Sequence, residues 1–153
     1  MFTPSLVTLY MKKYFLTFII IGLLSSCDKE SGRSNNNPYL PNYNFSATLN
    51  LNLPSYSGLN SNSNPTPITV DGDIDILMMK ISSTEYRAWN GNCPNQSPTA
   101  CSRLSISGLT AKCNCEDAYE YDMYSGIGNN GASYTLVPYR VEVLGNNTIR
   151  VYN

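Results

Sequence analysis

Residues 93–116 read CPNQSPTACSRLSISGLTAKCNCE and place four cysteines in two pairs, Cys93 with Cys101 and Cys113 with Cys115. The chain contains no histidine. Thiols clustered in this way serve as metal ligands, as a redox-active pair or as structural disulfides. The C-x-C spacing is neither the C-x2-C knuckle of structural zinc sites nor the C-x-x-C of redox enzymes, although Lys112 beside Cys113 would favour a reactive thiol. The residues leave all three interpretations open.

The chain of 153 residues, with 42% apolar and 14% charged residues, indicates one globular domain. Alternation of apolar and polar residues from Phe45 to Leu53, and again from Tyr139 to Val151, predicts antiparallel strands. Gly145-Asn146-Asn147 supplies residues that tolerate positive φ, so the second region predicts a terminal hairpin. We therefore expect a mainly β domain over residues 44–153, built from short antiparallel strands.

The N-terminal region has the pattern of an export signal. Two lysines after Met11 precede an apolar run over residues 14–24, which is shorter than the roughly 20 residues of a membrane span. Leu24-Ser25-Ser26-Cys27 then resembles a bacterial lipobox. We expect translation to start at Met11 and residues 1–27 to form the signal with its lipobox. Cys27 would be lipidated and would anchor the chain to a membrane.

Residues 28–43 are polar and rich in Asn and Pro, which predicts a flexible tether. Asp28 and Glu30 resemble the surface-export signal of Bacteroidetes lipoproteins, so we expect a cell-envelope protein, anchored to the outer membrane. The loss of Lys12 and Lys13 with the signal takes the ten basic residues to eight, against eleven acidic ones, a net charge of −3. This balance argues against a nucleic-acid partner.

The order of motifs over residues 44–153 resembles the Rieske iron-sulfur domain, in the short lipoprotein version found in Bacteroidetes. The motifs are NLNLPSY, a C-P-x segment, a C-x-C segment, Tyr-Asp-x-x-x-Gly and Pro-Tyr-x-Val before the closing hairpin. The resemblance implies stacked antiparallel sheets with a two-loop cluster-binding subdomain. It places Cys93 and Cys113 at the cysteine ligands of a 2Fe-2S cluster, and Cys101 and Cys115 at a disulfide that joins the two loops.

The chain departs from the family pattern at both histidine ligands, where it has Asn95 and Glu116. Two neutral imidazoles give the Rieske centre its high potential, a neutral amide is a weak donor to iron, and a carboxylate would add negative charge. We therefore expect no cofactor and no metal ligands. The alternative is a 2Fe-2S centre with nonstandard ligands, held by Cys93, Cys113, Glu116 and Asn95.

The resemblance also implies how the thiols pair when no iron is bound. Cys101 would bond to Cys115 across the backs of the loops, and Cys93 to Cys113 across the empty ligand positions. Each bond would stabilise a domain of this size by roughly 3 kcal/mol, and exported proteins keep their disulfides.

Other groups give weaker signals. Asp71, Asp73 and Asp75 lack the glycine and distant glutamate of an EF-hand and are expected to be solvated. The tyrosine cluster Tyr119, Tyr121 and Tyr124 could bind a glycan or a protein, but packing inside a β domain is the simpler expectation. Without histidine or a paired nucleophile we expect no enzyme. The sequence thus predicts a disulfide-stapled binding or structural module with an envelope protein partner that it does not name. The alternative is an electron-transfer protein.

Overall fold

The computed structural model describes residues 37–153. The expected export signal of residues 1–27, with its start at Met11 and lipidated Cys27, lies outside the described residues, as do residues 28–36 of the expected tether. Within the described residues, no helix has both the length and the apolar character that crossing a membrane requires.

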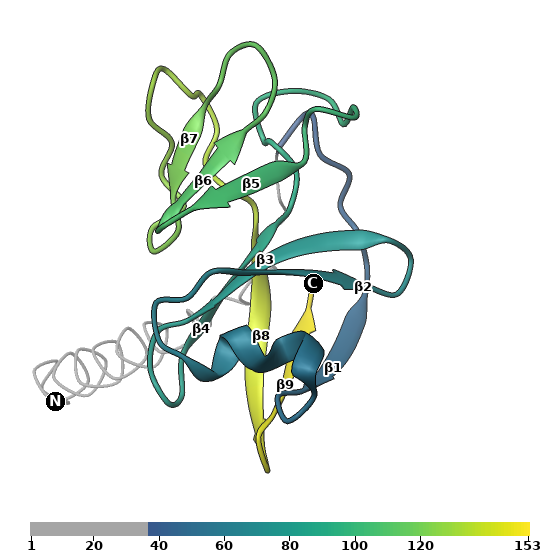
Figure 1. The fold of residues 1–153 in the computed structure, drawn as a ribbon. Helices are drawn as coiled ribbons and strands as arrows, with labels where there is room; N and C mark the ends of the chain where they lie inside the picture. The colour runs from purple at the N-terminus through teal and green to yellow at the C-terminus, as the bar shows by residue number, and fades with distance from the viewer. Residues whose placement is uncertain (1–36) are drawn as a thin grey trace, which may run out of the picture. The chain divides into compact units, whose positions relative to one another are not determined.

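The described part of the chain is built mainly from antiparallel strands, which confirms the predicted fold class (Figure 1). The elements are β1 (Ser46–Asn50), the 3-10 helix η1 (Pro54–Asn60), β2 (Thr66–Val70), β3 (Ile74–Lys80), β4 (Tyr86–Asn90), β5 (Leu104–Ser107), β6 (Thr110–Cys113), β7 (Glu120–Asp122), β8 (Pro138–Gly145) and β9 (Thr148–Tyr152).

One sheet has six strands in the order β1-β9-β8-β4-β3-β2, and a second has three in the order β5-β6-β7. The predicted terminal hairpin is present: β8 pairs with β9 around Asn146 and Asn147, whose φ angles are 50° and 56°. The first predicted strand is shorter than expected. It ends at Asn50, and Leu53 is 49% exposed in the turn that leads to η1.

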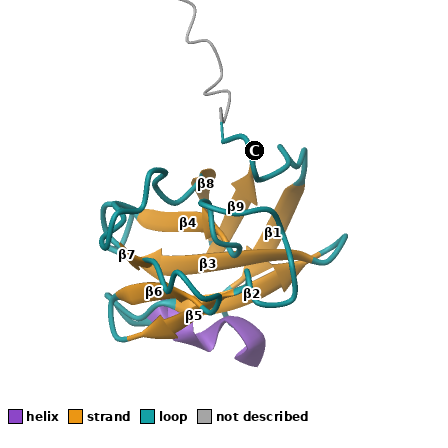
Figure 2. Cartoon of the chain, turned by 90° about the horizontal axis from the view of Figure 1, so that it is seen from above, coloured by secondary structure: helices purple, strands orange, loops and turns teal. Residues whose placement is uncertain are grey.

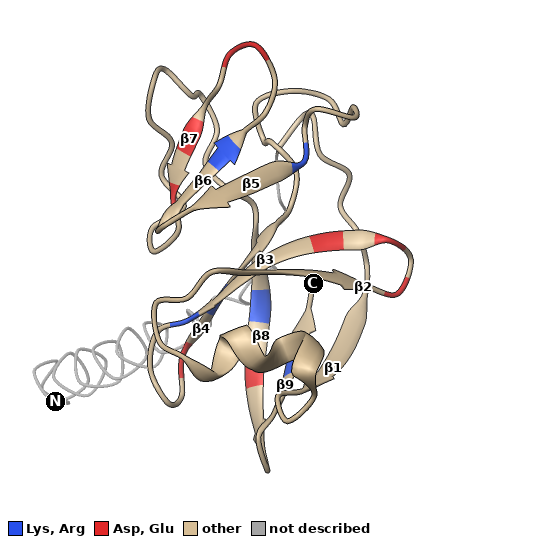
Figure 3. Cartoon of the chain, in the orientation of Figure 1, with Lys and Arg blue, Asp and Glu red and all other residues tan. Residues whose placement is uncertain are grey.

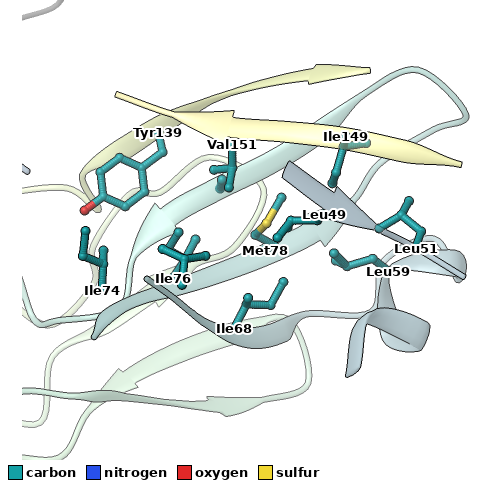
Figure 4. Close-up of a cluster of buried hydrophobic side chains, with 12 residues drawn as sticks. Leu49, Leu51, Leu59, Ile68, Ile74, Ile76, Met78, Tyr139, Ile149 and Val151 are labelled. Carbon is teal, nitrogen blue, oxygen red and sulfur yellow. The ribbon is translucent and has the colours of Figure 1, made fainter. Parts of the chain in front are cut away.

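Two apolar cores lie on opposite faces of β3. Ile74, Ile76 and Met78 contribute to the first core, while Leu77 and Met79 contribute to the second. The first core joins β3 to strands from the far end of the six-stranded sheet, so Leu49, Ile149 and Val151 face Ile68, Ile76 and Met78 (Figure 4). Burial on both faces explains why the run Ile-Leu-Met-Met shows no alternation in the sequence.

The second core lies between β3, β4 and the three-stranded sheet (Figure 2). Its members include Leu77, Met79, Trp89, Cys93, Leu104, Ala111, Cys113, Tyr121, Met123 and Leu136. The indole of Trp89 donates a hydrogen bond of 3.0 Å to the Met123 carbonyl. Gly126 has φ +74° and lies so close to this ring that an added Cβ would be 2.8 Å from a ring carbon. The glycine of the Tyr-Asp-x-x-x-Gly motif therefore lets the chain pass over Trp89.

Residues 37–43 lie against the domain, so they do not belong to a flexible tether as predicted. Leu40 is only 5% exposed, and the Asn37 amide donates a 2.8 Å hydrogen bond to the Pro94 carbonyl. The ring of Tyr39 meets that of Tyr134 edge-on at 5.7 Å. The prediction failed because polar composition describes most of this segment, whereas single apolar side chains anchor it.

Asp71 and Asp73 of the β2–β3 region are solvated, as the sequence predicts, whereas the Asp75 side chain is only 17% exposed. Asp71 and Asp73 are exposed in the turn, where Gly72 and Asp73 have φ angles of 84° and 55°. Asp75 lies on β3 and forms a 2.6 Å ion pair with Arg103. Of the three predicted tyrosines, Tyr121 is fully buried, Tyr119 packs against the second core and Tyr124 is 39% exposed.

Replacement of Ile76 by alanine tests the first core. Ile76 is completely buried on the third strand, so Ile76→Ala should lower the free energy of unfolding by about 3 kcal/mol through lost burial and a residual cavity. Val143→Ala is the control, since Val143 is 43% exposed, and should change it by less than about 0.5 kcal/mol. Urea denaturation followed by the fluorescence of Trp89, the single tryptophan, measures both. Equal effects of the two substitutions would contradict the assigned core.

Candidate functional site

Three loops meet at one end of the second core. We call residues 91–103 the first loop, residues 114–119 the second loop and residues 123–137 the third loop. Backbone hydrogen bonds close the base of the first loop, from Leu104 to Gly91 at 2.8 Å and from Cys93 to Ser102 at 2.7 Å. The second loop is closed by a 2.8 Å bond from Cys113 to Tyr119. These closures bring the four cysteines of residues 93–116 together.

Cys101 and Cys115 form a disulfide between the first and second loops, with a Cα–Cα distance of 5.1 Å. This pairing agrees with the one implied by the Rieske resemblance. We call it the outer disulfide, because Cys101 is exposed and Cys115 half-buried. The bond spans 14 residues of sequence, and closing a loop of this length contributes roughly 3 kcal/mol in the chain-entropy model.

Cys93 and Cys113 are free thiols, and the predicted disulfide between them is not formed. Both are fully buried in the second core, and Cys93 is close enough to raise the pKa of the Cys113 thiol. The surrounding strands hold these side chains next to each other as thiol neighbours, whereas a disulfide needs the sulfurs to approach to about 2.05 Å. We call Cys93 and Cys113 the inner thiol pair.

Within the inner thiol pair, the surroundings of Cys113 favour its protonated form. Burial, followed by the hydrogen bond to Cys93, raises the pKa of the Cys113 thiol to about 12, despite an opposing hydrogen bond from the backbone of Cys115. The Tyr121 hydroxyl lies 3.6 Å from the Cys93 sulfur, and burial raises the pKa of this phenol as well. Loss of the proton from the Cys113 thiol is therefore unfavourable at neutral pH.

Asn95 joins the first loop to the third loop and to the second core. Its side-chain nitrogen donates 2.8 Å hydrogen bonds to the Tyr121 hydroxyl and to the Tyr134 carbonyl. Its side-chain oxygen accepts from the backbone N–H groups of Ser133 at 2.7 Å and Tyr134 at 2.9 Å. An asparagine amide has two donors and two acceptor lone pairs, so its hydrogen-bonding capacity is filled. The two backbone donors also fix which atom of the amide is oxygen.

Glu116 lies in the second loop and is exposed to solvent. None of the ion pairs and side-chain hydrogen bonds of residues 37–153 involves its carboxylate. The residues at the two histidine positions therefore differ from each other: one is fully used in hydrogen bonds and the other faces water.

These residues do not fit a Rieske cluster. A cluster ligand at position 95 would have to give up hydrogen bonds that hold the third loop, and Glu116 would have to move from solvent to the inner thiol pair. Across residues 37–153, no group of three or more His, Cys, Asp or Glu side chains is arranged to hold a metal ion. What the loops supply instead is a buried dithiol, an accessible disulfide and a hydrogen-bonded amide.

Sequence reasoning identified the cysteines, Asn95 and Glu116 but did not identify the residues around them. Tyr121 was predicted only as packing, although its hydroxyl contacts both Cys93 and Asn95. Tyr134 and Tyr39 were missed as partners of the first loop and its neighbours. The Tyr-Asp motif was the one available signal, because a tyrosine fixed next to a turn can direct its hydroxyl toward the cysteine loops.

Comparisons with known proteins give structural similarity without a family assignment. No family model and no curated protein sequence matches the chain. A protein described as the small subunit of an NADH-dependent nitrite reductase from Mycobacterium tuberculosis is similar with a TM-score of 0.44 and 13% identity, over 73% of this chain and 97% of the other. The ferredoxin of carbazole 1,9a-dioxygenase from Nocardioides aromaticivorans IC177 is similar with a TM-score of 0.43 and 17% identity, over 62% and 91%.

Substitution of Asn95 tests whether its side-chain amide stabilises the fold or only occupies the position of a histidine ligand. Asn95→Ala removes four hydrogen bonds and should lower the free energy of unfolding by about 2 kcal/mol. Glu116→Ala, at the other histidine position, is the matched control and should change it by less than about 0.5 kcal/mol. Both are measured by urea denaturation. Equal stability of the two variants would refute the structural role of Asn95.

Proposed function

We propose that this chain is a lipid-anchored protein of the bacterial cell envelope, with a Rieske-like domain that has lost its 2Fe-2S cluster. The domain serves as a disulfide-stapled binding or structural module. The observation that carries this proposal is that all four hydrogen bonds of the Asn95 side chain are made to the third loop and to Tyr121. Exposure of the Glu116 side chain to solvent supports it further.

The proposal also concerns the position of the domain relative to the membrane. Lipidation of Cys27 would hold the chain on the outer membrane, because buried acyl chains contribute about 0.8 kcal/mol per CH2. Asn37, which donates a hydrogen bond to Pro94, stands ten residues after Cys27, and ten residues reach at most about 34 Å. The first loop, which Asn37 contacts, would then stay within that distance of the lipidated cysteine. An envelope protein is the expected partner.

The surface charge supports a partner other than nucleic acid. Lys and Arg residues are scattered over β3, β4, β6, β8 and β9 and the residue before β5, and acidic residues lie on β3, β7, β8 and in the loops (Figure 3). Ion pairs join neighbouring strands, as between Arg150 and Glu142 at 2.6 Å and Lys112 and Glu120 at 3.3 Å. Mixed charges of this kind make no basic stripe along a groove. We propose a non-enzymatic role, since the chain has no histidine to act as a general base.

An electron-transfer protein with an unusual 2Fe-2S ligation is the second candidate. The observation in its favour is the inner thiol pair, because Cys93 and Cys113 stay free and adjacent at the positions of the cysteine ligands. Two thiols fill only two of the four ligand positions of such a cluster. Asn95 and Glu116 would have to supply the rest.

Iron analysis distinguishes the two candidates. Full-length protein expressed with ample iron and purified without oxygen should be colourless, contain no stoichiometric iron or sulfide, and give no Rieske-type EPR signal after dithionite. A Rieske ferredoxin expressed in the same host controls for cluster assembly. Stoichiometric iron and sulfide with a low-temperature EPR signal would establish the electron-transfer function instead.

Substitution of the lipobox cysteine tests the anchor. Cys27→Ser removes the thiol that would carry the diacylglycerol, so the protein should lose metabolic labelling by palmitate and leave the membrane fraction. Ser26→Ala keeps a small residue before the cysteine and is the control that should label normally. Unchanged palmitate labelling of the Cys27→Ser variant would show that Cys27 is not the lipidated residue and would refute the proposed lipid anchor.

A further inference from the structure

We propose that the outer disulfide, Cys101–Cys115, is a thiol–disulfide exchange site for a dithiol reductant, and that its reduction opens access to the inner thiol pair, Cys93 and Cys113. The proposal rests on the proposed function in one respect only, that no cluster holds the inner thiols. It concerns a chemical activity of the loops that neither the staple role nor the anchor requires.

The two cysteine pairs differ sharply in accessibility. The side chain of Cys101 is exposed, whereas Cys93 and Cys113 are both 0% exposed. A thiolate must approach a disulfide sulfur directly in order to exchange with it, so an external dithiol can reach the outer disulfide and cannot reach the inner thiols. Burial also raises the pKa of Cys113, which lowers the reactivity of this thiol while the loops are closed.

The outer disulfide is the covalent link between the loops that bury the inner pair. Cys93 belongs to the first loop, and Cys113 immediately precedes the second. Other contacts between these loops are side-chain hydrogen bonds: the Asn114 amide donates to the Arg103 carbonyl at 2.8 Å, the Gln96 amide donates to the Cys115 sulfur, and the Thr99 hydroxyl lies 4.0 Å from that sulfur. These hydrogen bonds lie at exposed or half-buried positions, where each contributes little net stability. Breaking the S–S bond therefore leaves only such non-covalent contacts to hold the first loop against the second.

Opening of the second loop would directly uncover the inner pair. Cys113 is the last residue of β6, and its backbone N–H donates a 2.8 Å hydrogen bond to the Tyr119 carbonyl at the far end of the second loop, so movement of this loop removes one side of the Cys113 environment. The first core contains none of these cysteines, and its strands are joined by their own ladders. The loops can thus open locally while the six-stranded sheet stays folded.

The proposed activity consists of two thiol–disulfide exchange reactions, reduction of the outer disulfide and then oxidation of the inner thiol pair. A partner dithiol gives two electrons and two protons to Cys101–Cys115: its S–S bond breaks, two thiols form, and the partner becomes a disulfide. In the opened state an external disulfide accepts two electrons and two protons from Cys93 and Cys113, which form an S–S bond. The protein can then hold either pair oxidised, and the second form is the pairing that the sequence resemblance implied for an empty site.

Differential alkylation of the full-length protein in detergent tests whether reduction of the outer disulfide opens access to the inner thiol pair. Accessible thiols are labelled with iodoacetamide over a time course, the protein is unfolded, the remaining thiols are labelled with N-ethylmaleimide, and peptide mass spectrometry gives a rate for each cysteine. In oxidised protein Cys93 and Cys113 should react at least about 100-fold more slowly than in unfolded protein. After dithiothreitol reduces Cys101–Cys115, both rates should rise by at least about tenfold.

A paired variant and a structural readout make the test specific. Cys101→Ser/Cys115→Ser should show the fast rates without reductant and should form Cys93–Cys113 in glutathione disulfide. Hydrogen exchange of the β1 and β9 amides should stay slow in reduced wild-type protein, which shows local opening even if the double variant does not fold.

Three results would overturn the proposal: inner-thiol rates that do not change on reduction, loss of β1 and β9 protection at the same reductant concentration, or a Cys93–Cys113 disulfide in protein whose outer disulfide is intact. Iron measured on the same sample separates this test from that of the proposed function. Bound iron together with slow alkylation of Cys93 and Cys113 refutes the cluster-free function. Iron-free protein whose inner-thiol alkylation rates do not change on reduction refutes only the proposed opening of the loops.

Discussion

The hydrogen bonds of the Asn95 side chain determine how the loop end of this domain is built. One amide group connects the first loop to the backbone of Ser133 and Tyr134 and to the hydroxyl of Tyr121. The third loop has no covalent link to the cysteines, so this amide is its main polar attachment to them. A side chain with these bonds contributes to stability through its geometry, and the same geometry prevents it from acting as a ligand.

The loops rest on a frame that does not depend on them. β3 separates two cores, and the first of these holds the six-stranded sheet together without any residue from the cysteine loops. The second core contains Cys93, Cys113 and Tyr121, so changes in the loops act on this core first. This division means that the register of the six-stranded sheet does not rest on the residues of the cysteine loops. It also explains why the outer disulfide can act on local access without controlling the whole fold.

Alternation in the sequence was sufficient to predict the β class, the terminal hairpin and its turn, because these depend on local periodicity and on residues that tolerate positive φ. The outer disulfide followed from the resemblance of the C-x-C segment. The role of Asn95 could not be predicted, since its partners on the third loop are backbone groups 38 and 39 residues away. The inner thiols and residues 37–43 were predicted wrongly for a related reason: spacing and composition carry no information about side-chain direction or about the burial of a single leucine.

Nuclear magnetic resonance of the Asn95 side-chain amide tests the central claim most directly, because both of its N–H groups are hydrogen-bonded in the structure. We expect two separate side-chain signals that exchange slowly with water and do not shift or broaden when ferrous iron and sulfide are added without oxygen. Rapid exchange, or broadening of these signals by bound iron, would show that Asn95 is free to act as a ligand and that its amide does not have the structural role described here.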